Sequence, residues 1–318
     1  MYSLLKIIAR IAFPFYCRNI RINQKEILQL NGPLLIACNH PDSFLDAIIL
    51  ATLFKRPVYA LARGDVFANK FYAKILMGLK MFPVYRASEG VENMEHNYST
   101  FEKCRELFSK GGIVLIFSEG RCVNEWKLRS LMKGTARLAL SSWEKGIPLT
   151  VLPTGINYSG FSSFGKNLQL NFGNLITEKN IVSESGQGKN IIAFNTALKK
   201  ELATLVIELP KNDKAAIHAA FSIKQSWLKK ILLFIPAVAG WILHAPLYAP
   251  VKKIVWSRAA HNDHFDSLMV GILFLAYPIY LLLITAIAFL VSKQPMCFFL
   301  LLIMPFTAWS YIQLKRQS

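Results

Sequence analysis

Two long runs without a charged residue lie near the end of this 318-residue chain, and they constrain its fold more than any other feature. Residues 268–291 form a run of 24, residues 295–314 form a run of 20, and only three residues separate them. A helix of about 20 mostly apolar residues can cross the hydrocarbon core of a bilayer. The sequence therefore predicts a transmembrane hairpin within a C-terminal membrane region, residues 211–318.

A third uncharged run, residues 231–250, contains Pro236, Pro246 and Pro250. Proline removes a backbone donor and kinks or ends a helix, so we expect this run to be re-entrant or interfacial, with a spanning helix as the alternative. Basic residues flank the run and follow the hairpin, and the positive-inside rule places such flanks in the cytoplasm. We therefore expect a protein of the bacterial cytoplasmic membrane whose N-terminal domain faces the cytoplasm.

The formal charge of the chain is +18, which would suit nucleic acid, anionic lipid headgroups or phosphate-bearing substrates. The long apolar runs, without a recognisable RNA-binding or helix-turn-helix pattern, favour the lipid bilayer, and we expect no nucleic-acid partner. The five cysteines include no Cys-x-x-Cys pair, so neither a disulfide framework nor a zinc ribbon is indicated.

The first 22 residues open with an apolar segment that Lys6 and Arg10 interrupt, and no small-residue cleavage site follows. This segment is therefore not expected to be a cleaved signal peptide. As a helix it would carry Ser3, Lys6 and Arg10 on one stripe and apolar residues over the rest. The pattern predicts an interfacial helix over residues 1–22, with an ordinary helix packed on the core as the alternative.

Short β-type runs alternate with segments of helical spacing between residues 33 and 176. The β-type runs are 33–38, 58–62, 82–85, 112–118, 149–156 and 168–172. Helical spacing is found in 43–54, 66–79, 91–109, 131–145 and, beyond the last strand, about 190–208. This alternation predicts an α/β fold with a mixed, largely covered sheet and flanking helices. We assign it to one domain, residues 23–210.

The segment NHPDSFLD, residues 39–46, starts where the first predicted strand ends and enters a helix, where α/β enzymes tend to carry their sites. A histidine can take a hydroxyl proton near neutral pH, and a carboxylate on its other ring nitrogen fixes the tautomer. His40 and Asp46 supply these groups, and Asp42 is a second possible partner. The alternative is structural, with Asp42 or Ser43 capping the helix and His40 serving as a loop donor.

The same segment resembles the first motif of the glycerolipid acyltransferase superfamily, which includes lysophosphatidate and glycerol-3-phosphate acyltransferases. The commonest form of the motif has four residues between histidine and aspartate, whereas five separate His40 from Asp46, as in a subgroup of bacterial and fungal members. An extra residue turns a helical aspartate by about 100°. The loop before the helix must therefore absorb this rotation.

Three further segments resemble the later motifs of that superfamily, in order. FPVYR, residues 82–86, resembles the second motif, which implies that Arg86 contacts the acceptor phosphate. FSEGR, residues 117–121, resembles the third motif, Phe-Pro-Glu-Gly-Thr-Arg, with Ser118 in place of the proline and Cys122 at the usual arginine position. VLPTGI, residues 151–156, resembles the fourth, apolar motif, which helps line the acyl or acceptor region.

The resemblance implies direct transfer of an acyl group from acyl-CoA or acyl-carrier protein to a hydroxyl of a lysolipid or glycerol 3-phosphate. His40 would be the general base and Asp46 would hold its ring. The implied substrate-binding residues are Asn39, Arg86, Glu119, Gly120, Arg121 and Lys133, with Lys127 and Arg129 as further nearby cations. The resemblance implies no metal and no cofactor apart from the acyl donor.

Other interpretations of the sequence are weaker. Residues 160–167 nearly match a phosphate-binding P-loop, but Asn167 stands where Ser or Thr would hold magnesium, and a strand-like run follows. No Gly-x-Ser-x-Gly elbow of a serine hydrolase occurs. Cys38 is expected to be a core cysteine rather than a nucleophile. A catalytically inactive lipid-binding scaffold of the same fold remains the alternative to an enzyme.

Overall fold

The computed structural model describes residues 2–85, 91–182, 186–259 and 263–317. The chain divides by its packing into two units. The first comprises residues 1–10, 21–157 and 169–211, and the second comprises 11–20, 158–168 and 212–318. The division at 211/212 lies next to the boundary expected from the sequence. The grouping of residues 11–20 and 158–168 with the C-terminal part was not anticipated.

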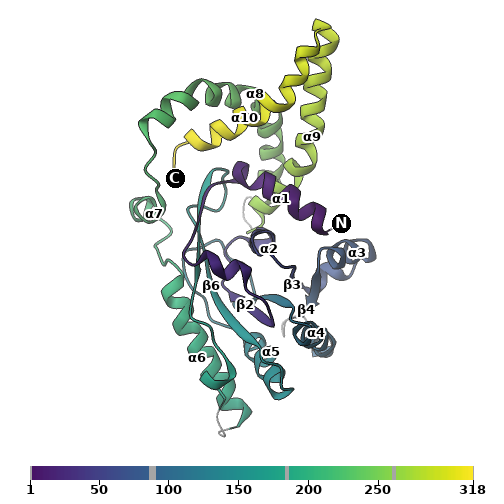
Figure 1. Ribbon diagram of the computed structural model, residues 1–318, viewed down its shortest axis with the longest axis vertical. Helices are drawn as coiled ribbons and strands as arrows, with labels where there is room; N and C mark the ends of the chain where they lie inside the picture. The colour runs from purple at the N-terminus through teal and green to yellow at the C-terminus, as the bar shows by residue number, and fades with distance from the viewer. Residues whose placement is uncertain (1, 86–90, 183–185, 260–262, 318) are drawn as a thin grey trace. The chain divides into compact units, whose positions relative to one another are not determined.

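A seven-stranded sheet has the order β1-β7-β6-β2-β5-β3-β4, and Figure 1 labels several of its strands. The strands are β1 Cys17–Ile22, β2 Leu34–Cys38, β3 Val58–Arg63, β4 Met81–Val84, β5 Ile113–Phe117, β6 Thr150–Tyr158 and β7 Lys166–Phe172. Six of them coincide with the predicted runs. The seventh, β1, corrects the helix expected over residues 1–22, because α1 (Tyr2–Tyr16) ends at Tyr16 and the strand begins at the next residue.

The strands β6, β2, β5, β3 and β4 are parallel to one another. Cys38 at the end of β2 pairs with Phe117 at the end of β5 and with Thr154 of β6. The residues that follow β2 and β5 therefore leave the sheet side by side. β6 and β7 are joined by seven residues, too few for a parallel crossover, so this pair is antiparallel. The mixed α/β class predicted from the sequence is confirmed.

Helices flank the sheet in the first unit and bury its apolar strands. They are α2 Ser43–Leu53, α3 Lys70–Gly78, α4 Val91–Ser109, α5 Lys133–Glu144 and α6 Gln187–Leu205. β2 is buried at every residue, as expected for a parallel strand covered on both faces. Phe194, Leu198 and Leu202 form the buried stripe of α6 in the same core. This core fixes the strand ends from which the candidate site extends.

The first half of α1 packs through its polar stripe. Lys6 Nζ donates to the carbonyl oxygen of Phe54 at the C-terminal end of α2, and Arg10 Nε donates to Thr52 O over 3.1 Å. Leu4 and Ile7 on the other side of the helix are 62% and 56% exposed. Cations are favourable at a helix C-terminus, so the charged residues face the domain while the apolar residues face outward. An interfacial helix would have this arrangement, and that assignment stays a prediction.

The second unit contains α7 (Lys214–Phe221), α8 (Trp227–Ala259), α9 (Phe265–Ser292), a short 3-10 turn η5 (Pro295–Phe299) and α10 (Leu300–Leu314). Among the described residues, three helical segments are long and apolar enough to cross a membrane, judged by length and composition. Two of them are the predicted hairpin, with left-handed Lys293 (φ 56°) at its turn. The third, α8, continues through all three prolines of the run 231–250.

Gly155 in β6 is a sensitive test of the packing between β6 and α6. A Cβ atom at this residue would lie 2.4 Å from the carbonyl oxygen of Leu205, which is backbone and cannot easily move. We expect Gly155→Ala to destabilise the protein by about 1–3 kcal/mol, as overpacking of a core does. Thermal unfolding of the full chain in detergent measures this.

The matched control is Gly188→Ala in the first turn of α6, where an added Cβ would meet nothing within 4 Å. This variant should be neutral or slightly stabilising, because alanine favours the helix by up to about 1 kcal/mol over glycine. Equal melting temperatures for both variants would contradict the described packing of β6 on α6.

Candidate active site

His40 and Asp46 lie together where β2 gives way to α2. His40 Nδ1 is 2.9 Å from Asp46 Oδ2, and the aspartate side chain is fully buried whereas the histidine is 17% exposed. The same carboxylate oxygen accepts the backbone N–H of Asp42 over 2.9 Å. Asp46 therefore fixes both the ring and the loop that carries it, and Asp42 contributes its backbone rather than its carboxylate.

The loop before α2 leaves regular backbone geometry at two residues. Ser43 at the start of α2 has a φ of 49°, in the left-handed region that non-glycine residues seldom adopt. The preceding Asp42 is also outside helical geometry, with φ −139° and ψ 48°. These two residues turn the chain so that Asp46, in the first turn of α2, still meets His40. The backbone strain is local to the site.

Phe117, the last residue of β5, stacks on the imidazole of His40. The ring centroids are 3.7 Å apart and the planes differ by 10°. In the tautomer in which Nδ1 donates its proton to Asp46, Nε2 is the nitrogen that carries the lone pair. Within the described part of the chain, no protein group bonds to Nε2. His40 is thus oriented as a general base with one nitrogen held and the other available.

Glu119 joins the loops that follow β2 and β5. Its carboxylate accepts the backbone N–H of His40 over 2.9 Å and that of Arg129 over 2.8 Å. The side chain is only 4% exposed. Burial raises the pKa of Glu119 above its ordinary value, and the two backbone donors oppose that shift. The sequence predicted that Glu119 shapes the substrate pocket, and the structure gives it this cross-linking role beside His40.

Asn39, which the sequence predicts to bind substrate, bonds to β6 through its side chain. Its amide nitrogen donates to Ile156 O over 3.0 Å, and its amide oxygen accepts the N–H of Ile156 over 2.8 Å. The residue is buried between β2 and β6, with 4% of its surface exposed. These two bonds position the chain that leads into His40, and the substrate-binding role of Asn39 stays a prediction.

The remaining predicted binding residues lie around the same strand ends. Gly120 has a φ of 71°, and a Cβ there would approach Met132 Cγ to 2.8 Å, so glycine is required at this turn. Arg121 is exposed directly after it, and Lys133 is exposed at the first turn of α5. Arg86 lies outside the described residues. The two described cations are therefore accessible near the histidine loop, as a phosphate-binding role would need.

Cys122 takes a structural place beside the histidine loop. The backbone N–H of Ser43 donates to its Sγ over 2.9 Å, which supports the left-handed residue at the start of α2. Sequence reasoning noted only that Cys122 replaces the usual arginine. Cys38 is fully buried in β2, and burial raises the pKa of its thiol well above the ordinary value. A buried neutral thiol fits the expected core cysteine.

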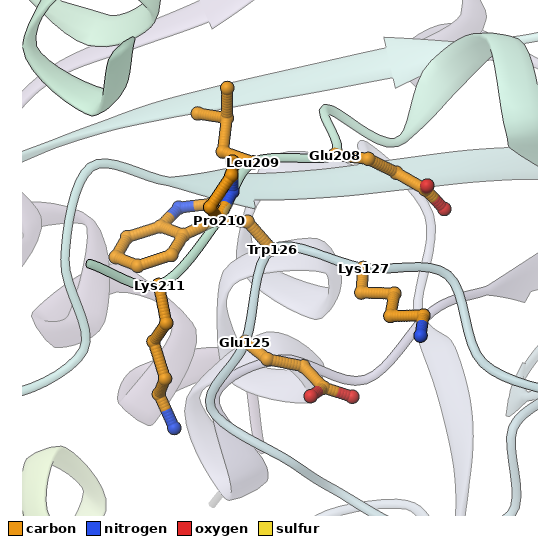
Figure 2. A pocket seen from close by; sticks show the side chains of 7 residues that line it. All are labelled: Glu125, Trp126, Lys127, Glu208, Leu209, Pro210 and Lys211. Carbon is orange, nitrogen blue, oxygen red and sulfur yellow. The ribbon is translucent and has the colours of Figure 1, made fainter. Parts of the chain in front are cut away.

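An open pocket of about 400 Å³ lies beside the loop that follows β5 (Figure 2). It is lined by Glu125, Trp126, Lys127, Glu208, Leu209, Pro210 and Lys211. Figure 2 shows the indole of Trp126 next to Pro210, with the two lysines on either side of Glu125. Both carboxylates have partners, because Glu125 pairs with Arg129 and Glu208 accepts the N–H of Leu128.

The loop that forms one wall of this pocket is bonded directly to the histidine loop. Val123 N donates to His40 O over 3.2 Å, and Asn124 Nδ2 donates to Pro41 O over 2.7 Å. Trp126 and Lys127 follow two and three residues later. One wall of the pocket is therefore continuous with the loop that holds the histidine loop. The pocket was not predicted from the sequence, because its second wall comes from residues 208–211.

The near-match to a P-loop does not form a phosphate site. Lys166 is buried at the start of β7, and its ammonium forms an ion pair with the buried carboxylate of Asp266. A P-loop lysine must instead reach a bound phosphate. Of the polar group 261–266 at the start of α9, residues 261 and 262 lie outside the described residues, and Asp266 belongs to this ion pair.

A sequence profile described as Acyltransferase matches residues 19–157, the part of the chain that contains the His40 site. The chain is 27% identical over 142 residues to a 1-acyl-sn-glycerol-3-phosphate acyltransferase of Chlamydomonas reinhardtii. It is 26% identical over 143 residues to a chloroplastic 1-acyl-sn-glycerol-3-phosphate acyltransferase of Arabidopsis thaliana. Residues 19–157 are therefore similar to the acyltransferase domains of the glycerolipid acyltransferase superfamily.

These similarities cover only part of each protein. The match to the Chlamydomonas acyltransferase covers 45% of this chain and 40% of that one, and the match to the Arabidopsis acyltransferase covers 45% and 38%. The solved 1-acyl-sn-glycerophosphate (LPA) acyltransferase PlsC from Thermotoga maritima is 14% identical. It superimposes with a TM-score of 0.47 over 71% of this chain and 81% of that one.

The buried Glu119 of this acyltransferase domain gives a pH-dependent prediction. Because the pKa of Glu119 is higher in the folded protein than in the unfolded chain, protonated Glu119 favours the folded state. This contribution to stability is complete below pH 4.5, the ordinary pKa, and is lost as the pH rises through the pKa of the folded protein. Glu119→Gln cannot titrate. The difference in stability between wild type and this variant should therefore shrink as the pH rises from about 4.5 to 7.

Thermal unfolding in detergent at several pH values measures this difference. Glu106→Gln, at an exposed residue of α4, is the matched control and should change stability little at any pH. A stability difference between wild type and Glu119→Gln that grows with rising pH would contradict the prediction.

Proposed function

We propose that this protein is an O-acyltransferase that moves a fatty acyl chain from a thioester to a hydroxyl of a lysophosphatidate-like lipid or of glycerol 3-phosphate. The observation that carries the proposal is the pair of His40 and the buried Asp46, with Nδ1 held at 2.9 Å and Nε2 available. The pair lies at the end of a parallel strand within the acyltransferase domain. This is a general base placed where an α/β fold carries its site.

In the proposed reaction, Nε2 of His40 takes the proton of the acceptor hydroxyl while its oxygen attacks the thioester carbonyl carbon. The new C–O bond forms, the C–S bond breaks, and the leaving thiolate takes the proton back from the imidazolium. Asp46 stabilises the imidazolium through Nδ1. Alignment of both substrates beside this base could supply about 7–11 kcal/mol of the barrier.

The acceptor phosphate is proposed to meet the cations around the end of β5. Arg121 and Lys133 are exposed there, and Lys127 lines the pocket beside the histidine loop. Lys133 also lies at the first turn of α5, whose N-cap residue Met132 makes no side-chain cap bond. Helix N-termini favour anions. Both relatives are named 1-acyl-sn-glycerol-3-phosphate acyltransferases, which supports an acceptor of this class.

The proposed location is a membrane, with acyl-CoA or acyl-carrier protein supplied from the side on which the acyltransferase domain lies. The three long apolar helices support membrane attachment. Basic residues before α8, at its end and after α10 support a cytoplasmic position for those ends. The bacterial cytoplasmic membrane stays a prediction, because one relative is named as chloroplastic.

His40→Ala tests the catalytic proposal. Removal of the base should lower the rate of acyl transfer by roughly 10²–10⁴-fold or more. Membranes that contain the full chain are incubated with labelled acyl-CoA or acyl-carrier protein and with a panel of lysolipids and glycerol 3-phosphate. His218→Ala, an exposed histidine of α7, is the matched control and should keep wild-type activity.

Loss of product with His40→Ala, but not with His218→Ala, would support the proposal that the protein is a transferase. No product from wild type with any donor and acceptor, with the protein folded, would instead favour the lipid-binding scaffold. The unusual Cys122 at the family's arginine position is the feature that makes that alternative worth testing.

Arg121→Ala and Lys133→Ala test the phosphate site. Each exposed charge contact is worth about 1 kcal/mol, so each variant should raise the KM for a phosphate-bearing acceptor about fivefold. The KM for an uncharged monoacylglycerol should not change. Arg137→Ala, exposed farther along α5, is the control of equal charge change. A rise confined to the KM for acyl-CoA would place these cations at the donor instead.

A further inference from the structure

Both ends of the α9–α10 hairpin are held by the same two short segments of the second unit. At the start of α9, buried Asp266 pairs with Lys166 and accepts a hydrogen bond from Tyr16 over 3.2 Å. At the end of α10, Arg18 donates to the carbonyl oxygens of Ile312 and Lys315. Tyr16 and Arg18 belong to residues 11–20, so the two hairpin ends lie on the same side of any membrane that the hairpin crosses.

The start of α8 is bonded to the end of α10. Lys229 Nζ donates to Gln313 Oε1 over 2.7 Å, and Gln225, just before the helix, donates to the Gln313 carbonyl. Gln317 holds the chain before α8, because its Oε1 accepts the N–H of Ile223 and its Nε2 donates to Ile223 O. The first end of α8 therefore lies at the level of the hairpin ends.

The last part of α8 packs against the start of α9. Val255 and Ala259 are buried in one apolar cluster with Phe265 and Met269. Residues 260–264 join the two helices, and 260–262 among them lie outside the described part. The second end of α8 therefore also lies at the level of the hairpin ends.

The middle of α8 reaches farther along the hairpin than either of its ends. A Cβ at Gly240 would lie 2.1 Å from Thr307 O, so α8 and α10 approach closely there. The carbonyl of Leu243 accepts the hydroxyl of Tyr280, and His244 contacts the hydroxyl of Tyr277 over 3.2 Å. These partners lie at least five residues inside the hairpin from its ends.

α8 thus advances along α10 and then returns along α9. From Lys229 to Gly240 its partners on α10 change from Gln313 to Thr307, toward the hairpin turn. From Leu243 to its end, the partners on α9 run from Tyr280 back to Phe265. Figure 1 shows α8 curved, with one part beside α10 and the other beside α9. Pro236, Pro246 and Pro250 lie inside it, as expected of a strongly bent helix.

We propose that α8 is a re-entrant helix, which enters the bilayer and returns to the same side, although it is long and apolar enough to cross. The lipid hydrocarbon of the leaflet on that side covers its exposed apolar side chains. In the first half of the helix these exposed side chains are Leu228, Ile231, Leu232, Phe234, Ile235, Val238, Trp241 and Ile242. Of the three long apolar segments in the described part of the chain, two then cross the membrane, namely α9 and the segment that contains α10.

Cysteine accessibility in the full-length protein tests this without relying on catalysis. The partly exposed Cys122 and Cys297 are changed to serine, and single cysteines are introduced at neutral exposed residues: Ser226→Cys before α8, Ser257→Cys near its end, and Gln294→Cys at the hairpin turn. A membrane-impermeant maleimide is applied to sealed vesicles of either orientation. We expect the first two cysteines to be labelled from the same side and the third only from the other side.

Labelling of residues 226 and 257 from opposite sides would overturn the proposal, because α8 would then cross the bilayer. Labelling of all three from one side would also overturn it, because the hairpin would not cross. Lys224→Cys and Arg258→Cys repeat the comparison with a second exposed pair. This pair keeps the measurement decisive should a serine variant fail to fold.

Discussion

The site depends on one buried carboxylate that has two partners on the same oxygen. Asp46 binds the ring of His40 and the backbone of Asp42, and no water-exposed surface of its own competes for those bonds. A buried charge is costly unless it is hydrogen-bonded. The histidine loop supplies the hydrogen bonds that the buried aspartate requires, and the aspartate in turn holds the loop in place. Glu119, which follows β5, is also buried and accepts one backbone N–H on each of its two carboxylate oxygens. The parallel register of β2 and β5 brings the two carboxylates to one edge of the sheet.

Much of the fold could be predicted from the alternation of apolar runs, because covered parallel strands are short, continuous and apolar. β1 was missed because it contains Arg18, Asn19 and Arg21 and follows α1 without a turn residue. Sequence patterns report burial on a helix or sheet face. They do not reveal an edge strand whose polar side chains bond to backbone far away in the sequence. Arg18 is such a residue, because it donates to a carbonyl oxygen at the end of α10.

The pair of His40 and Asp46 could be proposed from the motif, yet the sequence could not show the backbone that brings them together. That backbone includes the left-handed Ser43, which local pattern does not encode. The sequence also could not show that the amide of Asn39 bonds to Ile156, 117 residues away. Phe117 was part of a motif, but its stacking on the histidine follows only from the pairing of β2 with β5.

Phe117 covers one face of the His40 imidazole. One face of the ring is covered by an aromatic plane at 3.7 Å, and one edge is tied to Asp46. A ring held in this way cannot exchange its two nitrogens by a half-turn without breaking the bond to Asp46. The lone pair of Nε2 lies in the plane of the ring, so a molecule that gives it a proton must approach within that plane. Phe117 at the end of β5 and Asp46 hold that plane in place, and they therefore set the direction of approach.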